Sequence, residues 1–181
     1  MKTILTALIG AVLAAPVMAA DYSVAAGSSL GFTGSFQGEN FDGTFRTFSA
    51  AIRYDAADLA ASKFEVDIEL ASVVTGDSDR DGALPDADFF DVKGFPKARF
   101  VTTAFRQSGA EVIADGTLSL KGTTKPVSLK IAFTPNAGGA TLDVTTTLKR
   151  LDFNVGAGEY ADTSTIANEV KVKGHLVLAP K

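Results

Sequence analysis

The chain has 181 residues, a formal net charge of −4 and no block of basic residues, which argues against binding of nucleic acid or of anionic lipid surfaces. It contains no cysteine and one histidine, so disulfides and zinc sites built from these residue types are excluded. A chain of this length can form one domain with a sizeable core, which packing alone must stabilise.

The first 19 residues have the features of a secretory signal peptide. Lys2 is followed by an apolar run over residues 4–17, and the small residues of Val17-Met18-Ala19 suit cleavage after Ala19. The run is shorter than the roughly 20 residues that a membrane-spanning helix needs. We therefore expect a signal peptide at 1–19, one domain at 20–181, no stable membrane anchor and a periplasmic location; a signal anchor is the alternative.

Strands dominate the remaining sequence, and the first two are expected at residues 22–36 and 41–54. The apolar parity of the second strand changes between Phe45 and Phe48, so the strand must slip by one residue if both side chains face inward. A β-bulge near Thr47 would produce this slip.

The strand at residues 64–70 has the clearest period of two in the chain. Three carboxylates occupy one face, which we interpret as solvent-facing rather than catalytic. The apolar face carries Phe64, Val66, Ile68 and Leu70.

Residues 77–100 interrupt the strand pattern and are expected to be irregular or briefly helical. This segment holds Phe89, Phe90 and Phe95 among acidic residues and two prolines, and such an apolar cluster needs a surface to bury against. We interpret it as a lid over one mouth of a barrel.

Five further strands are expected, joined mostly by short turns that make neighbouring strands antiparallel. About eight strands with one polar face each favour a closed all-β barrel, because closure removes exposed edges and leaves room for one small ligand. A sandwich is the alternative. The five strands cover residues 99–107, 112–120, 127–134, 141–150 and 170–178.

A series of motifs, in this order, resembles the YceI family of bacterial, mostly periplasmic proteins, also called polyisoprenoid-binding-like. The motifs are Gly43-Thr44-Phe45, Asp88-Phe89-Phe90-Asp91, Phe95-Pro96, residues 116–127 and Arg150-Leu151-Asp152-Phe153. Lys121 and Asn154 depart from the family pattern, which more often has His and Gly there. The resemblance implies an extended lipocalin-like, eight-stranded antiparallel β-barrel that binds an isoprenoid or quinone-type lipid, with no enzymatic activity and no cofactor.

The inward apolar residues and the lid are the expected ligand-binding residues. Each buried CH₂ of a chain-like ligand gains about 0.8 kcal/mol, so apolar burial alone could bind such a chain tightly. The alternative is a barrel filled by its own side chains, acting as an interaction or stress-related module without a bound lipid. The expected residues are Phe45, Phe48, Ile52, Phe64, Val66, Ile68, Leu70, Phe89, Phe90, Phe95, Phe100, Leu118, Leu120, Leu129, Ile131, Phe133, Leu148 and Phe153.

Arg150 and Asp152 share the parity of Leu148 near the end of a strand. An Arg–carboxylate pair at a barrel mouth could orient the polar head of a ligand. A purely structural salt bridge is the alternative.

Asp77, Asp79 and Asp81, followed by Gly82, match the opening of an EF-hand calcium loop. The twelfth position holds Asp88 instead of the longer Glu, and a strand precedes the loop where a helix belongs. We interpret the segment as a solvated acidic loop in which Arg80 pairs with a neighbouring carboxylate; weak calcium binding is the alternative.

His175 is the only histidine and lies on the strand face opposite Leu176. A serine triad would depend on this single residue. We interpret it as exposed and without a catalytic role.

Overall fold

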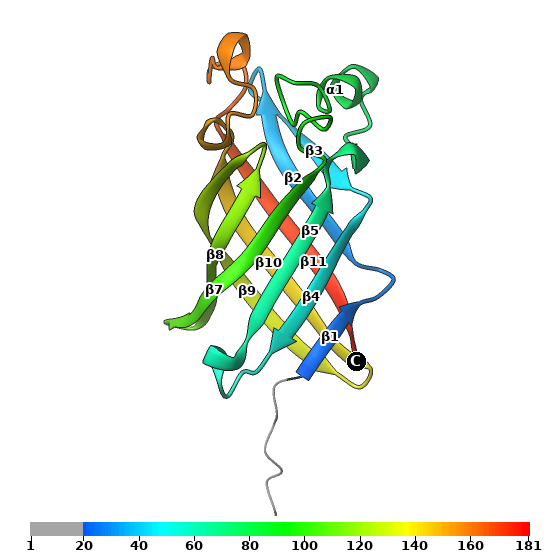
Figure 1. Cartoon of the computed structure of the whole chain (residues 1–181), viewed down its shortest axis with the longest axis vertical. Coiled ribbons are helices and arrows are strands. Elements are labelled where there is room, and N and C mark those ends of the chain that lie inside the picture. The colour runs from blue at the N-terminus through cyan, green and yellow to red at the C-terminus, as the bar shows by residue number, and fades with distance from the viewer. Residues whose placement is uncertain (1–19) are drawn as a thin grey trace, which may run out of the picture.

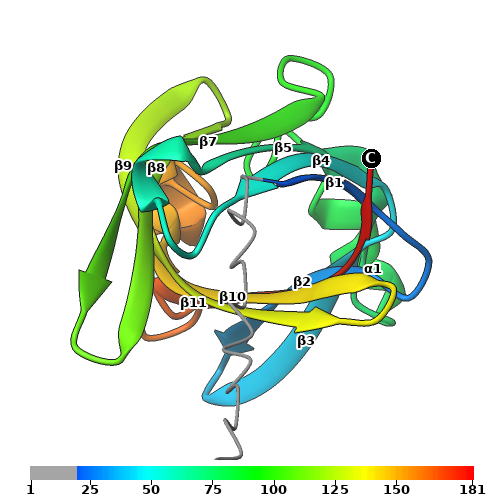
Figure 2. The ribbon, with the colours of Figure 1, turned by 90° about the horizontal axis from the view of Figure 1, so that it is seen from below.

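The computed structural model describes residues 20–181, and the expected signal peptide at 1–19 lies outside this part. Within it, the strands join into one antiparallel sheet that the pairing of β1 with β11 closes into a barrel (Figure 1). Seen from below, the strands form a ring (Figure 2). The strands are β1 (Ala20–Val24), β2 (Ser29–Phe36), β3 (Glu39–Phe45), β4 (Phe48–Tyr54), β5 (Lys63–Glu69), β6 (Val73–Val74), β7 (Lys97–Ser108), β8 (Glu111–Leu120), β9 (Thr123–Asn136), β10 (Gly139–Lys149) and β11 (Glu169–Pro180).

Helical structure is confined to the connections between strands. The helix α1 spans Ser78–Ala83 and lies at the upper rim of the barrel in the view of Figure 1. No helix among residues 20–181 is long and apolar enough to span a membrane. Short 3₁₀ helices cover Leu59–Ala61, Leu70–Ser72, Arg150–Phe153 and Gly158–Tyr160.

The expected eight-stranded antiparallel barrel is confirmed, although three of its strands are interrupted. β1 and β2 pair with successive parts of β11, so together they occupy one position in the ring. β3 and β4 form the next position, and β5 and β6 another, because β4 pairs with β5 while β3 pairs with β6. β7 to β11 supply the remaining five positions.

A strand break, rather than the expected β-bulge near Thr47, accommodates the parity change between Phe45 and Phe48. β3 ends at Phe45 and β4 begins at Phe48, and the backbone between them leaves the ladder. The Arg46 N–H donates to the carbonyl of Ser72 at 3.1 Å, in the 3₁₀ helix that interrupts the neighbouring position. Both phenylalanines consequently face the barrel interior.

A bulge does occur in β7, between Thr102 and Ala104. The ladder of β7 with β5 ends there, and the Thr102 hydroxyl accepts a hydrogen bond from the Phe64 N–H at 2.9 Å. The side chain therefore satisfies a buried backbone donor that the displaced strand no longer reaches.

The lower half of the barrel, at the end near β1, is filled by an aromatic cluster. The Tyr54 and Phe133 ring centroids are 4.4 Å apart, and those of Phe64 and Phe105 are 4.9 Å apart in an edge-to-face contact. Ile131, Leu142 and Leu178 pack into the same cluster. We call this cluster the plug, because it leaves the barrel open at one end only.

Phe64, 1% exposed, is a central residue of the plug. Phe64→Ala should lower the free energy of unfolding by about 3–5 kcal/mol, because it removes a fully buried ring and leaves a cavity. Urea unfolding followed by circular dichroism would measure this. Thr145→Val, on the exposed outer face of β10, should stay within about 0.5 kcal/mol of the wild type. Equal stability of the two variants would contradict the plug.

Candidate functional site

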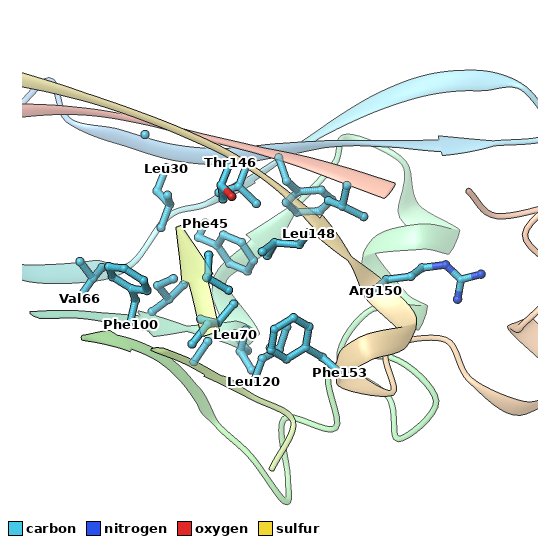
Figure 3. Close-up of a pocket in the computed structure, with 18 of the residues that line it drawn as sticks. Leu30, Phe45, Val66, Leu70, Phe100, Leu120, Thr146, Leu148, Arg150 and Phe153 are labelled. Atoms are coloured by element: carbon cyan, nitrogen blue, oxygen red, sulfur yellow. The ribbon is translucent and has the colours of Figure 1, made fainter. Parts of the chain in front are cut away.

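Above the plug, the barrel encloses an apolar cavity of about 220 Å³ (Figure 3). A single buried water needs only about 10–15 Å³ of such space, so the cavity is too large to be a packing defect. Its floor consists of plug residues, and its walls are the inward side chains of the upper strands. The floor residues are Ile52, Phe64, Leu142 and Leu176.

The structure places most of the expected apolar residues along this cavity. Alternate residues of a strand point to the same face, which is the pattern that identified these residues in the sequence. β5, β7, β8 and β10 therefore each contribute consecutive inward-facing positions to the cavity wall. These residues are Phe45, Phe48, Ile52, Phe64, Val66, Ile68, Leu70, Phe89, Phe90, Phe100, Leu118, Leu120, Leu129, Leu148 and Phe153.

Three of the expected residues lie elsewhere. Ile131 and Phe133 point inward as expected, but at the level of the plug. Phe95 is 38% exposed and lies against Gly122 in the hairpin between β8 and β9, where an added Cβ would come within 2.7 Å of its ring. These three side chains are therefore not among those that line the cavity.

Some lining residues were not anticipated from the sequence. Leu30 and Phe32 line the cavity from β2, whose glycines obscure the alternation. Thr146 lines it from β10 and was missed because it is polar, although its parity matches that of Leu148. Parity alone would have identified Thr146.

The cavity opens at the upper end between α1 and the loop around Tyr160. A second hollow there shares Phe41, Leu84, Phe89 and Ile166 with the cavity, so the two hollows adjoin at these side chains. The rings of Phe89 and Tyr160 are 5.0 Å apart at this opening. We call this opening the mouth.

The charged residues of the mouth are mostly acidic. The side chains of Asp77, Asp79, Glu159 and Asp162 lie around it together with one guanidinium, that of Arg80. The hydrogen bond from the Ser164 hydroxyl holds the pKa of Asp162 below its ordinary value, which keeps this carboxylate charged. The mouth is therefore a negatively charged rim around an apolar opening.

Lys121 connects the lid to the loop that follows β10. Its ammonium donates to the carbonyl of Asp88 at 3.0 Å and to that of Asn154 at 2.8 Å. The Asp88 carbonyl also accepts from the Gly156 N–H at 2.8 Å. Both Lys121 and Asn154, the two departures from the family pattern, thus take part in holding these segments together.

Arg150 stabilises the loop that follows β10 and does not face the cavity as a free charge. Its side chain is buried, and Figure 3 shows its guanidinium directed away from the apolar residues. All of its hydrogen bonds go to backbone carbonyls, at 2.5–3.2 Å. The acceptors are the carbonyls of Val155, Gly156, Tyr160, Ile166 and Ala167.

The expected pairing of Arg150 with Asp152 is wrong. An arginine side chain has five N–H donors, and five carbonyls occupy them here. Asp152 is exposed and forms no ion pair within residues 20–181. Burial lowers the pKa of Arg150, and no donor of its guanidinium is left for the head group of a ligand.

Arg150→Met should lower the free energy of unfolding by roughly 3 kcal/mol or more, since buried carbonyls would lose a charged donor. Arg150→Lys should recover only part of this stability, because an ammonium has three donors and cannot span five acceptors. Urea unfolding measures the stability, and limited proteolysis reports on residues 154–168. Full recovery by lysine would show that charge, not the hydrogen-bond pattern, stabilises the loop.

The residues that match the opening of a calcium loop have structural roles at α1. Asp77 caps the helix by accepting from the Arg80 N–H at 2.9 Å. Asp81 accepts from both the N–H and the hydroxyl of Thr75, each at 2.6 Å. Arg80 lies 3.9 Å from Asp77 and 4.0 Å above the ring of Phe41. Among residues 20–181, no group of three or more potential metal ligands is gathered at one point.

The hydrogen bond from the Thr75 hydroxyl holds the pKa of Asp81 below its ordinary value near 3.8. Between the two pKa values the unfolded chain binds more protons, so the stabilisation is present above pH 3.8 and is lost as the pH falls through the folded-state pKa. The stability difference between wild type and Asp81→Asn should therefore shrink on acidification. Unfolding of both between pH 2 and 6 tests this.

The exposed Asp79 provides the matched control for Asp81, because it lies in the same helix. Asp79→Asn should lower the free energy of unfolding much less than Asp81→Asn does, because no hydrogen bond of the Asp79 side chain within residues 20–181 is lost. A gap between wild type and Asp81→Asn that stays constant down to pH 2 would contradict the role assigned to the Asp81 carboxylate.

His175 lies on the outer face of β11, opposite Leu176, as expected. Its Nδ1 is 2.6 Å from a carboxylate oxygen of Asp143, the cross-strand neighbour in β10. Arg99 forms a similar contact on the outside of β7, with Glu65 and Asp67. His175 therefore belongs to the charged outer surface and lies away from the cavity.

The chain belongs to the YceI-like family. The family model described as YceI-like domain matches residues 22–178. A UPF0312 protein of Pseudomonas putida is 36% identical over an alignment of 187 positions that covers 96% of this chain and 96% of the relative. A UPF0312 protein of Pseudomonas savastanoi pv. phaseolicola is 36% identical over an alignment of 163 positions that covers 83% of this chain and 84% of the relative. The resemblance seen in the sequence is thereby confirmed.

Solved structures share the barrel. The crystal structure of Burkholderia cenocepacia BcnA matches with a TM-score of 0.82 and 33% identity, over 86% of this chain and 99% of that one. The Campylobacter jejuni YceI protein matches with a TM-score of 0.69 and 27% identity, over 79% of this chain and 86% of that one. A polyisoprenoid binding domain from Saccharophagus degradans matches with a TM-score of 0.66 over 91% of this chain and 100% of that one, and at 21% identity this likeness concerns the fold alone.

Proposed function

We propose that this protein binds a long apolar lipid of the isoprenoid or quinone type in the barrel cavity and carries or stores it in the periplasm. The observation that carries the proposal is the cavity itself, which is apolar along its walls, closed below by the plug and open at the mouth. Affinity would come from burial of the chain, at about 0.8 kcal/mol for each CH₂. The signal-like residues 1–19 support the periplasmic location.

The composition of the cavity wall favours binding over catalysis. Among the described lining residues, Ser35, Thr146 and Arg150 are the only polar ones, and Arg150 is saturated by carbonyls. Membership of the YceI-like family likewise suggests a binding protein rather than an enzyme. The alternative of a barrel filled by its own side chains describes the plug, whereas the apolar cavity above the plug supports a ligand-binding barrel.

The charge of the mouth narrows the kind of lipid. Four carboxylates and one guanidinium surround the entrance, and an anionic head such as a phosphate would meet like charges there. A neutral head meets no such repulsion. We therefore favour an uncharged lipid, such as a quinone or a prenyl alcohol, over a prenyl phosphate.

Native mass spectrometry of the protein purified from its own host tests the proposal. The wild type should carry an adduct of lipid mass, and extraction with organic solvent should release a neutral lipid. Leu148→Trp, which places an indole in the cavity, should lose the adduct. Thr147→Trp adds the same bulk on the exposed outer face of β10 and should keep it.

Three outcomes would contradict the proposal. Absence of an adduct from the wild type argues against a carrier, and retention of the adduct by Leu148→Trp would place the lipid outside the cavity. Release of an anionic lipid would contradict the preference for an uncharged head.

A further inference from the structure

One hydroxyl interrupts the apolar wall of the cavity. The inward positions of β10 alternate through Leu142, Val144, Thr146 and Leu148, and Thr146 is the polar one. Figure 3 shows its oxygen among the apolar side chains that line the cavity. Its backbone pairs in register with Val172 of β11, so the strand ladder does not involve the hydroxyl.

The Thr146 hydroxyl has no hydrogen-bond partner among residues 20–181. Every fully enclosed side-chain nitrogen or oxygen in this part of the chain does have a partner. Thr146 is only partly buried and lines the cavity, so its hydroxyl is not fully enclosed by protein and lies within reach of a guest. It can therefore donate to, or accept from, whatever occupies the cavity.

The other polar lining residues do not offer an equivalent group. Arg150 is saturated by carbonyls. Ser35 lies near the rim at the parity of Thr33, whose side chain bonds to Asp42 on the exposed face of the barrel. Thr146 thus supplies the free hydrogen-bonding group within the wall.

Resting on the proposed function, we infer that Thr146 is the polar anchor for the lipid and hydrogen-bonds a hydroxyl or carbonyl oxygen of a neutral lipid inside the cavity. Thr146 is four residues from Arg150 at the rim and four from Leu142 at the floor, about 13 Å along the strand in each direction. The oxygen-bearing end of the lipid therefore lies inside the barrel, and the apolar chain is buried along the cavity wall between Thr146 and the mouth.

A matched pair of probes tests this inference: phytol, and phytene, which has the same branched chain without the hydroxyl. Displacement of the neutral dye N-phenyl-1-naphthylamine gives both dissociation constants. Thr146→Val replaces the hydroxyl with a methyl of similar size, leaving the phytol hydroxyl without a partner. The ratio of the phytol to the phytene dissociation constant should rise about fivefold relative to wild type.

Two variants serve as controls. Thr146→Ser keeps the hydroxyl and should keep the wild-type ratio, and Thr147→Val makes the same exchange on the outer face and should leave the ratio unchanged. An unchanged ratio in Thr146→Val, with both probes still displacing the dye, would overturn the role of Thr146 alone. Failure of both probes to displace the dye from wild type would overturn the proposed function as well.

Discussion

The uneven filling of the barrel is the constraint on which the rest of the structure depends. Eight strands enclose an interior that side chains can fill, and below Phe64 and Leu142 the aromatic residues of the plug do so. Above that level a second cluster of buried side chains, which includes Phe100 and Phe153, packs beside the cavity and fills only part of the interior. Apolar side chains thus form both the packed plug and the wall of the cavity above it. The level of a residue along the barrel axis decides whether it belongs to the plug or to the wall.

The open end needs a different source of order, because its backbone has few partners in a sheet. Arg150 supplies it by collecting five carbonyls from residues 155–167 around one guanidinium. Asp77 and Asp81 order α1 and the segment before it. Asp77 caps the helix by accepting from the Arg80 N–H, and Asp81 accepts two hydrogen bonds from Thr75. Charged side chains that look like ligand or metal groups in the sequence therefore serve here to hold the rim in shape.

Much of the fold could be predicted because strand alternation is a local property of the sequence. Inward parity was correct even for Ile131 and Phe133, but the level that a residue reaches in the barrel depends on strand stagger, which alternation does not encode. Phe95 could have packed on either side of the rim, and the deciding feature is Gly122, 27 residues further along. The partners of Arg150 are backbone carbonyls, which have no signature in the sequence.

The ammonium of Lys121 has a consequence for kinetics. It holds carbonyls of two neighbouring segments, Asp88 in the lid and Asn154 in the loop that follows β10, yet it is not among the residues that line the cavity. Loss of this one bridge would weaken the contact between the two segments, which the bond from the Gly156 N–H to the Asp88 carbonyl would still join, and would leave every wall contact in place. For the proposed lipid, the exchange rate would then depend on Lys121 and the affinity on the wall residues, so the two properties could change separately during evolution.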